Sequence, residues 1–345
     1  SVVFTDRSLN SMSVSFQTVM TDISALLKDA YNAAAVAVIP GGGTFGMESI
    51  ARQFANDQHV MIIRNGWFSY RWSEILEKGK IASSTTVMMA RREDTGGSNQ
   101  MAPFTPVPVD EVVATIRDEK PAVVFAPHVE TSAGMILPDD YIRAVSDAVH
   151  EVGGIFVLDC VASGALWVDM PALGVDVLLS APQKGWSASP CAGLVMLSER
   201  GRAAVAATES SSYVCDVKKW LAIMETYENG GHAYHATMPT DALKLFRDTL
   251  IETKSYGFEA VRQEQIQLGA SIRALLEERG FASVAADGFK AASVVVSYTD
   301  DEALKNGSKF AAAGLQIAAG VPLQCGEGPD YKSFRIGLFG LDKLH

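Results

Sequence analysis

A lysine at position 184 lies between two apolar runs of the chain. Residues 175–179 are apolar apart from one aspartate and predict a short buried strand, which cannot continue past Pro182. Residues 193–197 form the second apolar run. Because small or apolar residues flank the connection between these strands, we expect Lys184 to lie outside bulk water. A desolvated lysine has a lowered pKa and can act as a nucleophilic amine toward carbonyl groups.

An acidic residue ends the strand that precedes this connection. Residues 154–159 have the pattern of a buried strand, and Asp159 stands at its carboxyl end, where open α/β sheets bind their ligands. Pyridoxal phosphate needs a lysine that forms a Schiff base with its aldehyde and an acid that faces its pyridinium nitrogen. Asp159 and Lys184, in this order and each at the end of a strand, therefore predict a pyridoxal phosphate site.

A glycine-rich turn near the start of the chain predicts a site for an anion. Residues 36–39 have the pattern of a buried strand, Pro40 and three glycines follow, and residues 44–53 predict a helix. The free N–H groups and the positive dipole end at the start of such a helix attract phosphate groups.

The same glycines leave a second interpretation open. Gly41, Gly43 and Gly46 have the GxGxxG spacing of dinucleotide-binding proteins. The next predicted strand ends in Arg64 about 20 residues later, where an NADP enzyme could hold its additional phosphate. An NADP-dependent oxidoreductase that uses this turn is therefore the alternative outside pyridoxal phosphate chemistry.

Two more unusual stretches follow predicted strands. Residues 65–72, Asn-Gly-Trp-Phe-Ser-Tyr-Arg-Trp, predict an aromatic turn whose rings either pack in the core or stack on a flat cofactor. Residues 127–134, Pro-His-Val-Glu-Thr-Ser-Ala-Gly, follow a strand predicted at 122–126. Several such sites on one edge of a parallel sheet are the arrangement expected of a ligand crevice.

The elements that position these residues alternate along the chain. Helical patterns alternate with the strands above, at residues 14–31, 109–119, 137–152 and, as two helices, 240–278. A strand at 293–298 and a helix near 303–315 then predict a smaller C-terminal unit. This alternation is typical of an α/β fold with a parallel sheet.

Composition excludes several classes of function. The chain has 345 residues, a net charge of −11 and no basic block, so we expect no nucleic-acid partner. Its apolar runs are far too short to span a membrane, and its first residues do not resemble a signal peptide. Its four cysteines lack CxxC spacing and suggest neither a zinc site nor a disulfide framework. We expect a reducing compartment, with the cytoplasm as the default and an organelle not excluded.

The histidines do not predict a metal site. His232 and His235 are spaced i, i+3, but no third ligand is near them and glycines break the helix. We therefore expect no metal among the cofactors.

Together, these motifs resemble those of the class V aminotransferases, the pyridoxal-phosphate enzymes of fold type I, and within them the alanine–glyoxylate and serine–pyruvate aminotransferase group. The resemblance covers nearly the whole chain and keeps the order of the family's motifs. It implies a mostly parallel seven-stranded sheet flanked by helices and a smaller C-terminal α+β domain. It also implies a large cofactor-binding domain at residues 15–245 and a small domain formed by 1–14 and 246–345.

The resemblance also implies which residues bind the cofactor. The matching segments, with the family's motif in parentheses, are 42–44 (phosphate loop), 65–71 (NGxFGxR), 128–134 (HGESSTG), 159–163 (DSVAS) and 180–184 (SGSQK). The implied contacts are Gly43 and Thr44 in the phosphate loop, Phe68 stacked on the ring, Thr131 hydrogen-bonded to the cofactor, Asp159 at the ring nitrogen, Val161 against the ring, Gln183 near the phosphate and Lys184 as the Schiff-base lysine.

Two further segments extend the implied site. Tyr234 and Thr237 match the family's Tyr-x-x-Thr segment, which reaches the phosphate from the neighbouring subunit and implies an obligate homodimer. Residues 334–340 resemble the RIGLLG segment, so Arg335 would hold the substrate carboxylate. A planar guanidinium can hold a carboxylate through two parallel hydrogen bonds.

Three features depart from the family pattern. Neither the Pro-Gly-Pro segment at the family's start nor the helix after its RIG segment is present, so both ends are expected to be trimmed. Residues 82–101 look longer than the family's usual connection. All three features lie where substrate choice could be set.

The implied reaction is a ping-pong transamination between a small α-amino acid, of the alanine or serine type, and a 2-oxo acid such as glyoxylate or pyruvate. Lys184 would hold the cofactor as an aldimine, be displaced by the donor amine and then move the proton. Asp159 would keep the ring nitrogen protonated, and Arg335 would orient the substrate.

Two alternatives remain inside this class, and a non-catalytic homologue that acts as a binding protein is a second alternative outside it. The 2-aminoethylphosphonate–pyruvate aminotransferases share the His-x-Glu-Thr pattern of residues 128–131 but usually have asparagine before the lysine, where this chain has Gln183. Cysteine desulfurases need a reactive cysteine, for which Cys325 is the candidate, but usually have histidine before the lysine. A non-catalytic homologue would be expected to lack Lys184 or Asp159, and both are present.

Overall fold

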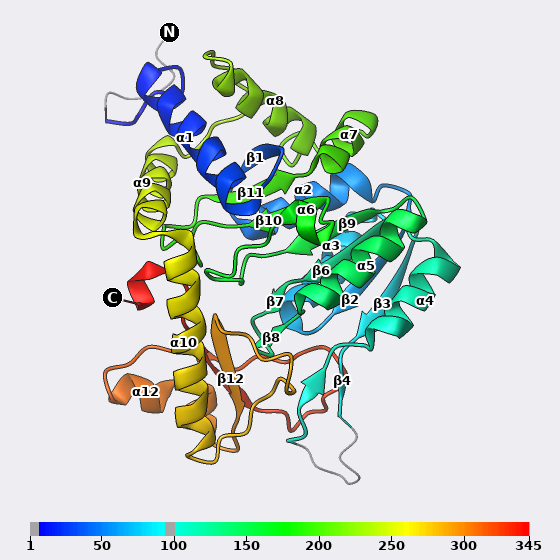
Figure 1. The fold of residues 1–345 in the computed structure, drawn as a ribbon, viewed down its shortest axis with the longest axis vertical. Coiled ribbons are helices and arrows are strands. Elements are labelled where there is room, and N and C mark those ends of the chain that lie inside the picture. Colours follow the sequence, from blue (N-terminus) through cyan, green and yellow to red (C-terminus); the bar gives the residue numbers. More distant parts are fainter. Residues whose placement is uncertain (1–6, 94–100, 345) are drawn as a thin grey trace.

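The computed structural model describes residues 7–93 and 101–344, and its centre is a seven-stranded sheet (Figure 1). In spatial order the strands are β1 (Ala35–Pro40), β11 (Ala192–Leu197), β10 (Val177–Ser180), β9 (Ile155–Asp159), β6 (Val123–Pro127), β2 (His59–Arg64) and β3 (Ser84–Met89). Neighbouring strands from β10 to β3 run parallel, whereas β11 runs antiparallel to both β10 and β1. The prediction of a mostly parallel sheet is confirmed.

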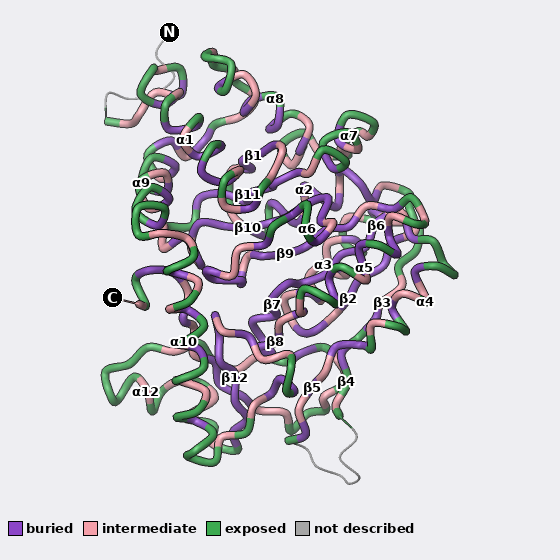
Figure 2. The backbone as a smooth tube through the Cα atoms, in the orientation of Figure 1, coloured by how far each residue is buried: buried purple, intermediate pink, exposed green. Residues whose placement is uncertain are grey.

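Helices lie on both faces of this sheet (Figure 1). In the first two thirds of the chain they are α1 (Val14–Tyr31), α2 (Gly43–Phe54), α3 (Trp67–Gly79), α4 (Val109–Glu119), α5 (Asp139–Glu151), α6 (Met170–Leu173), α7 (Glu199–Ala207) and α8 (Val217–Glu228). Every residue of β6, β10 and β11 is buried (Figure 2). Strands that are covered on both faces have continuous apolar sequences, which is why the sequence reveals them.

The C-terminal part adds a smaller antiparallel sheet. Its strands are β12 (Val294–Tyr298), β14 (Ser333–Gly337) and β13 (Ala318–Ala319), in this spatial order. Helix α9 (Thr240–Tyr256) packs on α1, and α10 (Phe258–Glu277) packs on β12. This agrees with the predicted smaller α+β unit. The domain division at residue 245 stays a prediction, and that position lies inside α9.

Two short hairpins stand apart from the sheets. β4 (Arg91–Arg92) pairs with β5 (Phe104–Thr105), and β7 (Val129–Glu130) pairs with β8 (Met135–Ile136). The predicted long connection at 82–101 includes residues 94–100, which lie outside the described residues. The β7–β8 hairpin follows β6 directly and carries Thr131 in its turn.

Two predictions of local structure need correction. The helix expected near 303–315 is two short helices, α11 (Glu302–Lys305) and α12 (Ser308–Ala312), because Gly307 between them has a left-handed φ of 82°. The segment expected as an aromatic turn at 65–72 is helical from Trp67, where α3 begins. Helices α7 and α8 were not expected from the sequence. A single turn of 3₁₀ helix, Leu341–Lys343, closes the described chain.

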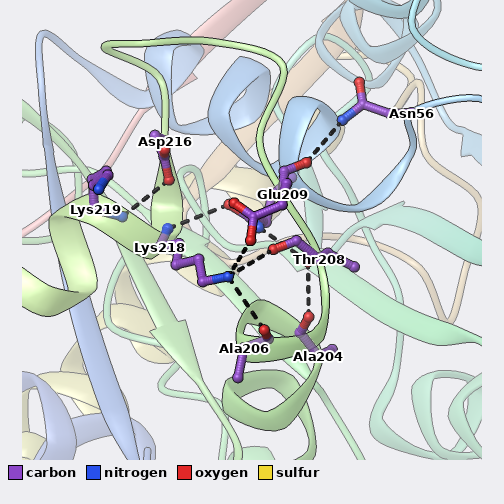
Figure 3. A network of polar contacts seen from close by, with 9 residues as sticks. Asn56, Ala204, Ala206, Thr208, Glu209, Asp216, Lys218 and Lys219 are labelled. Carbon is purple, nitrogen blue, oxygen red and sulfur yellow. Dashed lines mark hydrogen bonds and ion pairs between the residues drawn. The ribbon is translucent and has the colours of Figure 1, made fainter.

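A polar network ties α7 to α8 and α2. The ε-amino group of Lys218 donates to the carbonyl oxygens of Ala206 and Thr208, each at 3.3 Å (Figure 3). Gln53 donates from Nε2 to the Thr208 hydroxyl at 3.0 Å and accepts from the Lys218 backbone N–H at 3.3 Å. A cationic side chain at a helix C-terminus satisfies carbonyl groups that the helix leaves unpaired.

None of the helices described is long and apolar enough to cross a lipid bilayer.

Candidate active site

The residues after several neighbouring parallel strands surround one cavity. With its mouth it measures about 710 Å³, within the usual range for small-molecule sites. It is lined by Gly43, Thr44, Met47, Phe68, Ser69, Arg71, Pro127, Val129, Thr131, Asp159, Val161, Ala162, Gln183 and Lys184. The structure therefore brings together all of the sequence-predicted cofactor residues except Tyr234 and Thr237. The roles of these residues stay predictions.

Lys184 lies on the turn that follows β10. The backbone N–H of Ser187 donates to the Lys184 carbonyl at 3.1 Å, which closes the turn. Burial, and after it the positive charge of Arg335, lowers the pKa of Lys184 below its usual value. Its Nζ atom lies 4.9 Å from the centroid of the Phe339 ring. The side chain is thus a partly desolvated amine that loses its proton more easily than a surface lysine.

Asp159 is the last residue of β9 and lines the same cavity. Its Oδ1 accepts a hydrogen bond from the backbone N–H of Val161 at 3.0 Å, which fixes the carboxylate. Burial raises the pKa of Asp159 to about 6, with a smaller contribution from the negative charge of Glu130. The group is therefore mostly ionised at neutral pH and can pair with a cationic ligand atom.

The glycine-rich turn before α2 forms another wall of the cavity. A Cβ atom on Gly43 would lie 3.2 Å from Val161 Cγ2 and 3.5 Å from Ala181 Cβ, so a larger residue would crowd this wall. The guanidinium of Arg71 donates to the Thr44 hydroxyl at 2.9 Å. The first N–H groups of a helix have no partner within it, and with a nearby cation they suit a phosphate group.

Gln183 has a polar atom that the protein leaves unpaired. Its Oε1 atom is buried and has no hydrogen-bond partner in the described part of the chain. The oxygen and nitrogen of an amide can exchange places by a flip, so this side chain could offer either an acceptor or a donor to a ligand. Because buried polar groups normally have partners, the observation fits a polar ligand in the cavity.

The Phe68 ring lies among positive charges. The Cζ atom of Arg71 is 5.2 Å and that of Arg335 5.6 Å from its centroid. Arg335 itself lies on β14, is 9% exposed and does not line the cavity. Its Nε donates to the Ala319 carbonyl at 2.8 Å. That bond uses one side of the guanidinium and fixes its plane.

Tyr234 and Thr237 lie away from the cavity of their own chain. Tyr234 is 63% exposed, and its hydroxyl is 3.4 Å from the Thr237 hydroxyl. The ring of His235 holds this segment, because its Nε2 lies 2.7 Å from the Tyr213 carbonyl oxygen and its ring contacts Trp220. This histidine, considered in the sequence as a metal ligand, thus has a packing role.

Two charged residues at or beside the cavity were not predicted from the sequence. Arg71 lies one helical turn after Phe68, so both residues share a face of α3; an early helix start at Trp67 would have revealed this. Glu130 is fully buried behind the cavity wall and is described below.

The dinucleotide alternative finds no support in the geometry. A dinucleotide-binding turn joins a parallel strand to its crossover helix. Among the strands that the structure describes, β1 pairs with β11 alone, and that pairing is antiparallel. The Arg64 guanidinium, the predicted partner of an additional phosphate, already has protein partners. It donates to the Ser73 hydroxyl at 2.8 Å and to the Gln324 carbonyl at 3.2 Å.

Comparison with known sequences finds relatives among the aminotransferases, although no family model matches. A 2-aminoethylphosphonate–pyruvate transaminase of Paraburkholderia phymatum is 27% identical over 340 residues, which cover 97% of this chain and 84% of the relative. Alanine–glyoxylate aminotransferase 1 of Saccharomyces cerevisiae is 28% identical over 255 residues, covering 70% of this chain and 62% of the yeast protein.

Solved structures show the same fold. An alanine–glyoxylate aminotransferase from Nostoc sp. has a TM-score of 0.82 and 20% identity, and the match covers 98% of this chain and 85% of that one. A pyridoxamine–pyruvate aminotransferase from Mesorhizobium loti has a TM-score of 0.81 and 18% identity, with 99% and 83% covered. This chain is therefore a homologue of the alanine–glyoxylate and 2-aminoethylphosphonate–pyruvate aminotransferases, and it has the fold of the class V, fold type I enzymes.

Proposed function

We propose that this protein catalyses transamination between a small α-amino acid and a 2-oxo acid, with pyridoxal phosphate as cofactor. The observation that carries the proposal is that Lys184 and Asp159 line one cavity and are both held in place. The Ser187 N–H donates to the Lys184 carbonyl, and the Val161 N–H donates to the Asp159 carboxylate. Relatives that are 27–28% identical are named for transamination of alanine with glyoxylate and of 2-aminoethylphosphonate with pyruvate, which supports the same reaction class.

The lining of the cavity fits this cofactor. The first N–H groups of α2, the Thr44 hydroxyl and the Gln183 amide would hold the phosphate. Phe68 and Val161 would pack against the ring, and Thr131 would donate a hydrogen bond to it. When bound, pyridoxal phosphate acts as an electron sink for negative charge that develops on the substrate Cα.

The protein's own side chains would divide the remaining work. Lys184, through Nζ, would hold the cofactor aldehyde until the donor amine displaces it, and the free amine would then take the proton from the substrate Cα. Its lowered pKa favours the neutral form that this step needs. Asp159 would balance the positive charge of the ring nitrogen, and the Arg335 guanidinium would hold the substrate carboxylate.

An absorption titration tests the proposal. Protein loaded with pyridoxal phosphate should show a visible band, and alanine or serine should shift it, while glyoxylate or pyruvate should restore it. A panel that also includes aspartate and glutamate defines the donor. If the loaded protein shows no visible band, the proposed reaction is wrong.

A second donor belongs in the same panel. One relative, of which the match covers 84%, is named for transamination of 2-aminoethylphosphonate with pyruvate. A phosphonate, like a carboxylate, suits a guanidinium such as that of Arg335. Gln183 replaces the asparagine usual in those enzymes, so we keep alanine or serine as the first candidate.

We also propose that the active unit is a homodimer in which Tyr234 and Thr237 reach the neighbouring subunit's cavity. Their exposure in the single chain supports this arrangement. A homodimer in which both subunits carry Tyr234→Ala should therefore bind the cofactor about tenfold more weakly, because each site loses one hydrogen bond and the packing of the tyrosine ring.

Mixed dimers provide the decisive measurement for this arrangement. A Tyr234→Ala subunit paired with a Lys184→Ala subunit contains one cavity with both native residues, so wild-type turnover should return at about half of the sites. Mixed dimers without recovered turnover, or a monomer by light scattering, would contradict the shared site.

Replacing Cys325 with serine should leave transamination within about twofold of wild type. Burial raises the pKa of Cys325 to about 12, so the thiol is protonated at neutral pH and a poor nucleophile. The measurements are amino transfer and sulfide release from cysteine. Sulfide release by the wild type that disappears in the variant would favour a desulfurase instead. We also propose that the protein works in a reducing compartment, with the cytoplasm as the default, because its four cysteines lack the spacing of a disulfide framework.

A further inference from the structure

We infer that Glu130 is a positioning residue that holds the N-terminus of α3, and with it Phe68, against the cofactor cavity. The inference rests on the proposed function, because Phe68 is placed there as the ring that packs on the cofactor. Glu130 does not line the cavity, and it would act only through the residues that do.

Glu130 is a fully buried carboxylate with an unusually complete set of donors. It is 0% exposed. It accepts from the backbone N–H groups of Phe68 at 3.2 Å, Ser69 at 2.9 Å and Ser132 at 3.1 Å. It also accepts from the hydroxyls of Ser69 and Ser132, each at 2.7 Å. No arginine or lysine donates to it among the described residues, so these bonds are what offset the cost of burying the charge.

The donors come from two separate elements. Phe68 and Ser69 belong to the first turn of α3, whose N–H groups have no partner within the helix. Ser132 lies in the turn between β7 and β8, more than 60 residues away in sequence. A negative charge at this position also interacts favourably with the dipole of α3. The carboxylate therefore fastens the start of α3 to the β7–β8 hairpin.

The start of α3 packs tightly against the β7–β8 hairpin. The Ser132 hydroxyl accepts from the Trp67 backbone N–H at 2.9 Å, which adds a third anchor for the first turn. A Cβ atom on Gly66 would lie 2.7 Å from Glu130 Cγ and would also collide with the Ser132 hydroxyl. Only glycine permits this close approach of the helix start to the carboxylate.

Both elements that Glu130 joins carry cavity residues. Helix α3 brings Phe68 and Arg71, and the hairpin brings Val129 and Thr131. Because Glu130 bonds to the Phe68 N–H itself, loss of the carboxylate would free the backbone of the stacking residue. The side chain thus sets the spacing between two walls of the cavity.

The test measures the cofactor affinity of Glu130→Gln by equilibrium titration, with the visible circular dichroism of the bound cofactor as a second readout. Glutamine keeps the size but turns an NH₂ group toward N–H donors, so those donors lose their acceptor. We expect cofactor binding to weaken by about tenfold or more and the circular dichroism of the band to decrease.

Asp176→Asn is the matched control. Asp176 is also buried, at 1% exposed, and its carboxylate accepts from the Phe156 N–H at 2.8 Å, but it does not line or adjoin the cavity. Both variants should lower the unfolding temperature. Only Glu130→Gln should alter cofactor affinity, and an equal loss of affinity in both would overturn the inference.

A double-mutant cycle with Phe68→Ala separates positioning from general destabilisation. If Glu130 acts through Phe68, Glu130→Gln should weaken binding no more than about twofold further in the Phe68→Ala background. Additive effects in the cycle would refute the inference. If Glu130→Gln does not fold, Ser132→Ala replaces it in the same cycle. That substitution removes the acceptor of the Trp67 N–H and one hydroxyl donor to Glu130.

The two proposals fail in different ways. A wild-type protein that does not bind pyridoxal phosphate would refute the proposed function and this inference together. A wild type that binds the cofactor, with Glu130→Gln and Ser132→Ala binding equally well, would refute this inference alone.

Discussion

Replacing Lys184 with alanine is expected to abolish transamination, with a loss in kcat of at least about 10⁴-fold, because one side chain would both hold the cofactor and move the proton. The variant should still take up pyridoxal phosphate, since the phosphate-binding groups of α2 and the ring-packing residues are untouched. Borohydride should link the cofactor covalently to the wild type and not to the variant. Mass spectrometry of the reduced wild type should place the adduct on Lys184.

Lys218→Ala is the matched control for this prediction. Lys218 is also a partly buried lysine, 36% exposed in its side chain, with two carbonyl partners outside the cavity. We expect that variant to lose stability, since its network ties α7 to α8, and to keep the visible band and its reduction by borohydride. A Lys184→Ala protein that is still reduced at another lysine with normal turnover would refute the assignment.

The fully buried strands of the large sheet are the part of the fold that the sequence predicts best. Residues 123–127, 177–180 and 192–197 are buried on both faces, so their apolar runs stand out without any knowledge of their neighbours. Because the carboxyl ends of parallel strands share one edge, the order of Asp159 and Lys184 along the chain was enough to predict that they meet. Their convergence in one cavity needed no further information.

The start of α3 could not be predicted in the same way. Residues 65–72 contain four aromatic rings, which favour a strand or a packed turn more than a helix. The helix starts at Trp67 because Ser132 and Glu130 accept hydrogen bonds from its first three N–H groups, and both residues lie more than 60 positions downstream. A cap that comes from elsewhere in the chain has no local signal, so both the helix and the role of Arg71 were missed.

The glycine-rich turn shows a different limit. Its spacing fits both a phosphate loop and a dinucleotide fingerprint, since each places free N–H groups at the start of a helix. The difference lies in the strand before it, because β1 pairs antiparallel with β11 rather than with a parallel neighbour. Strand pairing of this kind depends on residues about 150 positions apart and is not encoded in the turn itself. The sequence of the turn therefore does not distinguish an NADP site from a phosphate loop.

Replacing Asp159 with asparagine is the second change with a large expected effect, a fall in kcat of about 10²–10³-fold. Asparagine has the same shape and can still accept the hydrogen bond from the Val161 N–H. It cannot carry the negative charge that keeps a ring nitrogen protonated, so the cofactor would stabilise charge on the substrate less well. The cofactor band should persist while turnover falls, a split between binding and catalysis that loss of folding would not produce.

The pH dependence of the same variant supplies an independent check. The pKa of Asp159 is raised to about 6, so its carboxylate is ionised above that pH and neutral below it. Cofactor affinity of the wild type should therefore fall as the pH drops through about 6, and Asp159→Asn should lack this fall.

The stability of the cofactor-free fold should change in the opposite direction, because a raised carboxyl pKa means that the folded state binds the proton more tightly than the unfolded state. The wild type should gain stability as the pH falls below about 6, and the variant should lose that gain. Asp176→Asn, a buried carboxylate away from the cavity, should keep the affinity profile of the wild type. An affinity profile that is unchanged in Asp159→Asn would mean that another group balances the ring nitrogen.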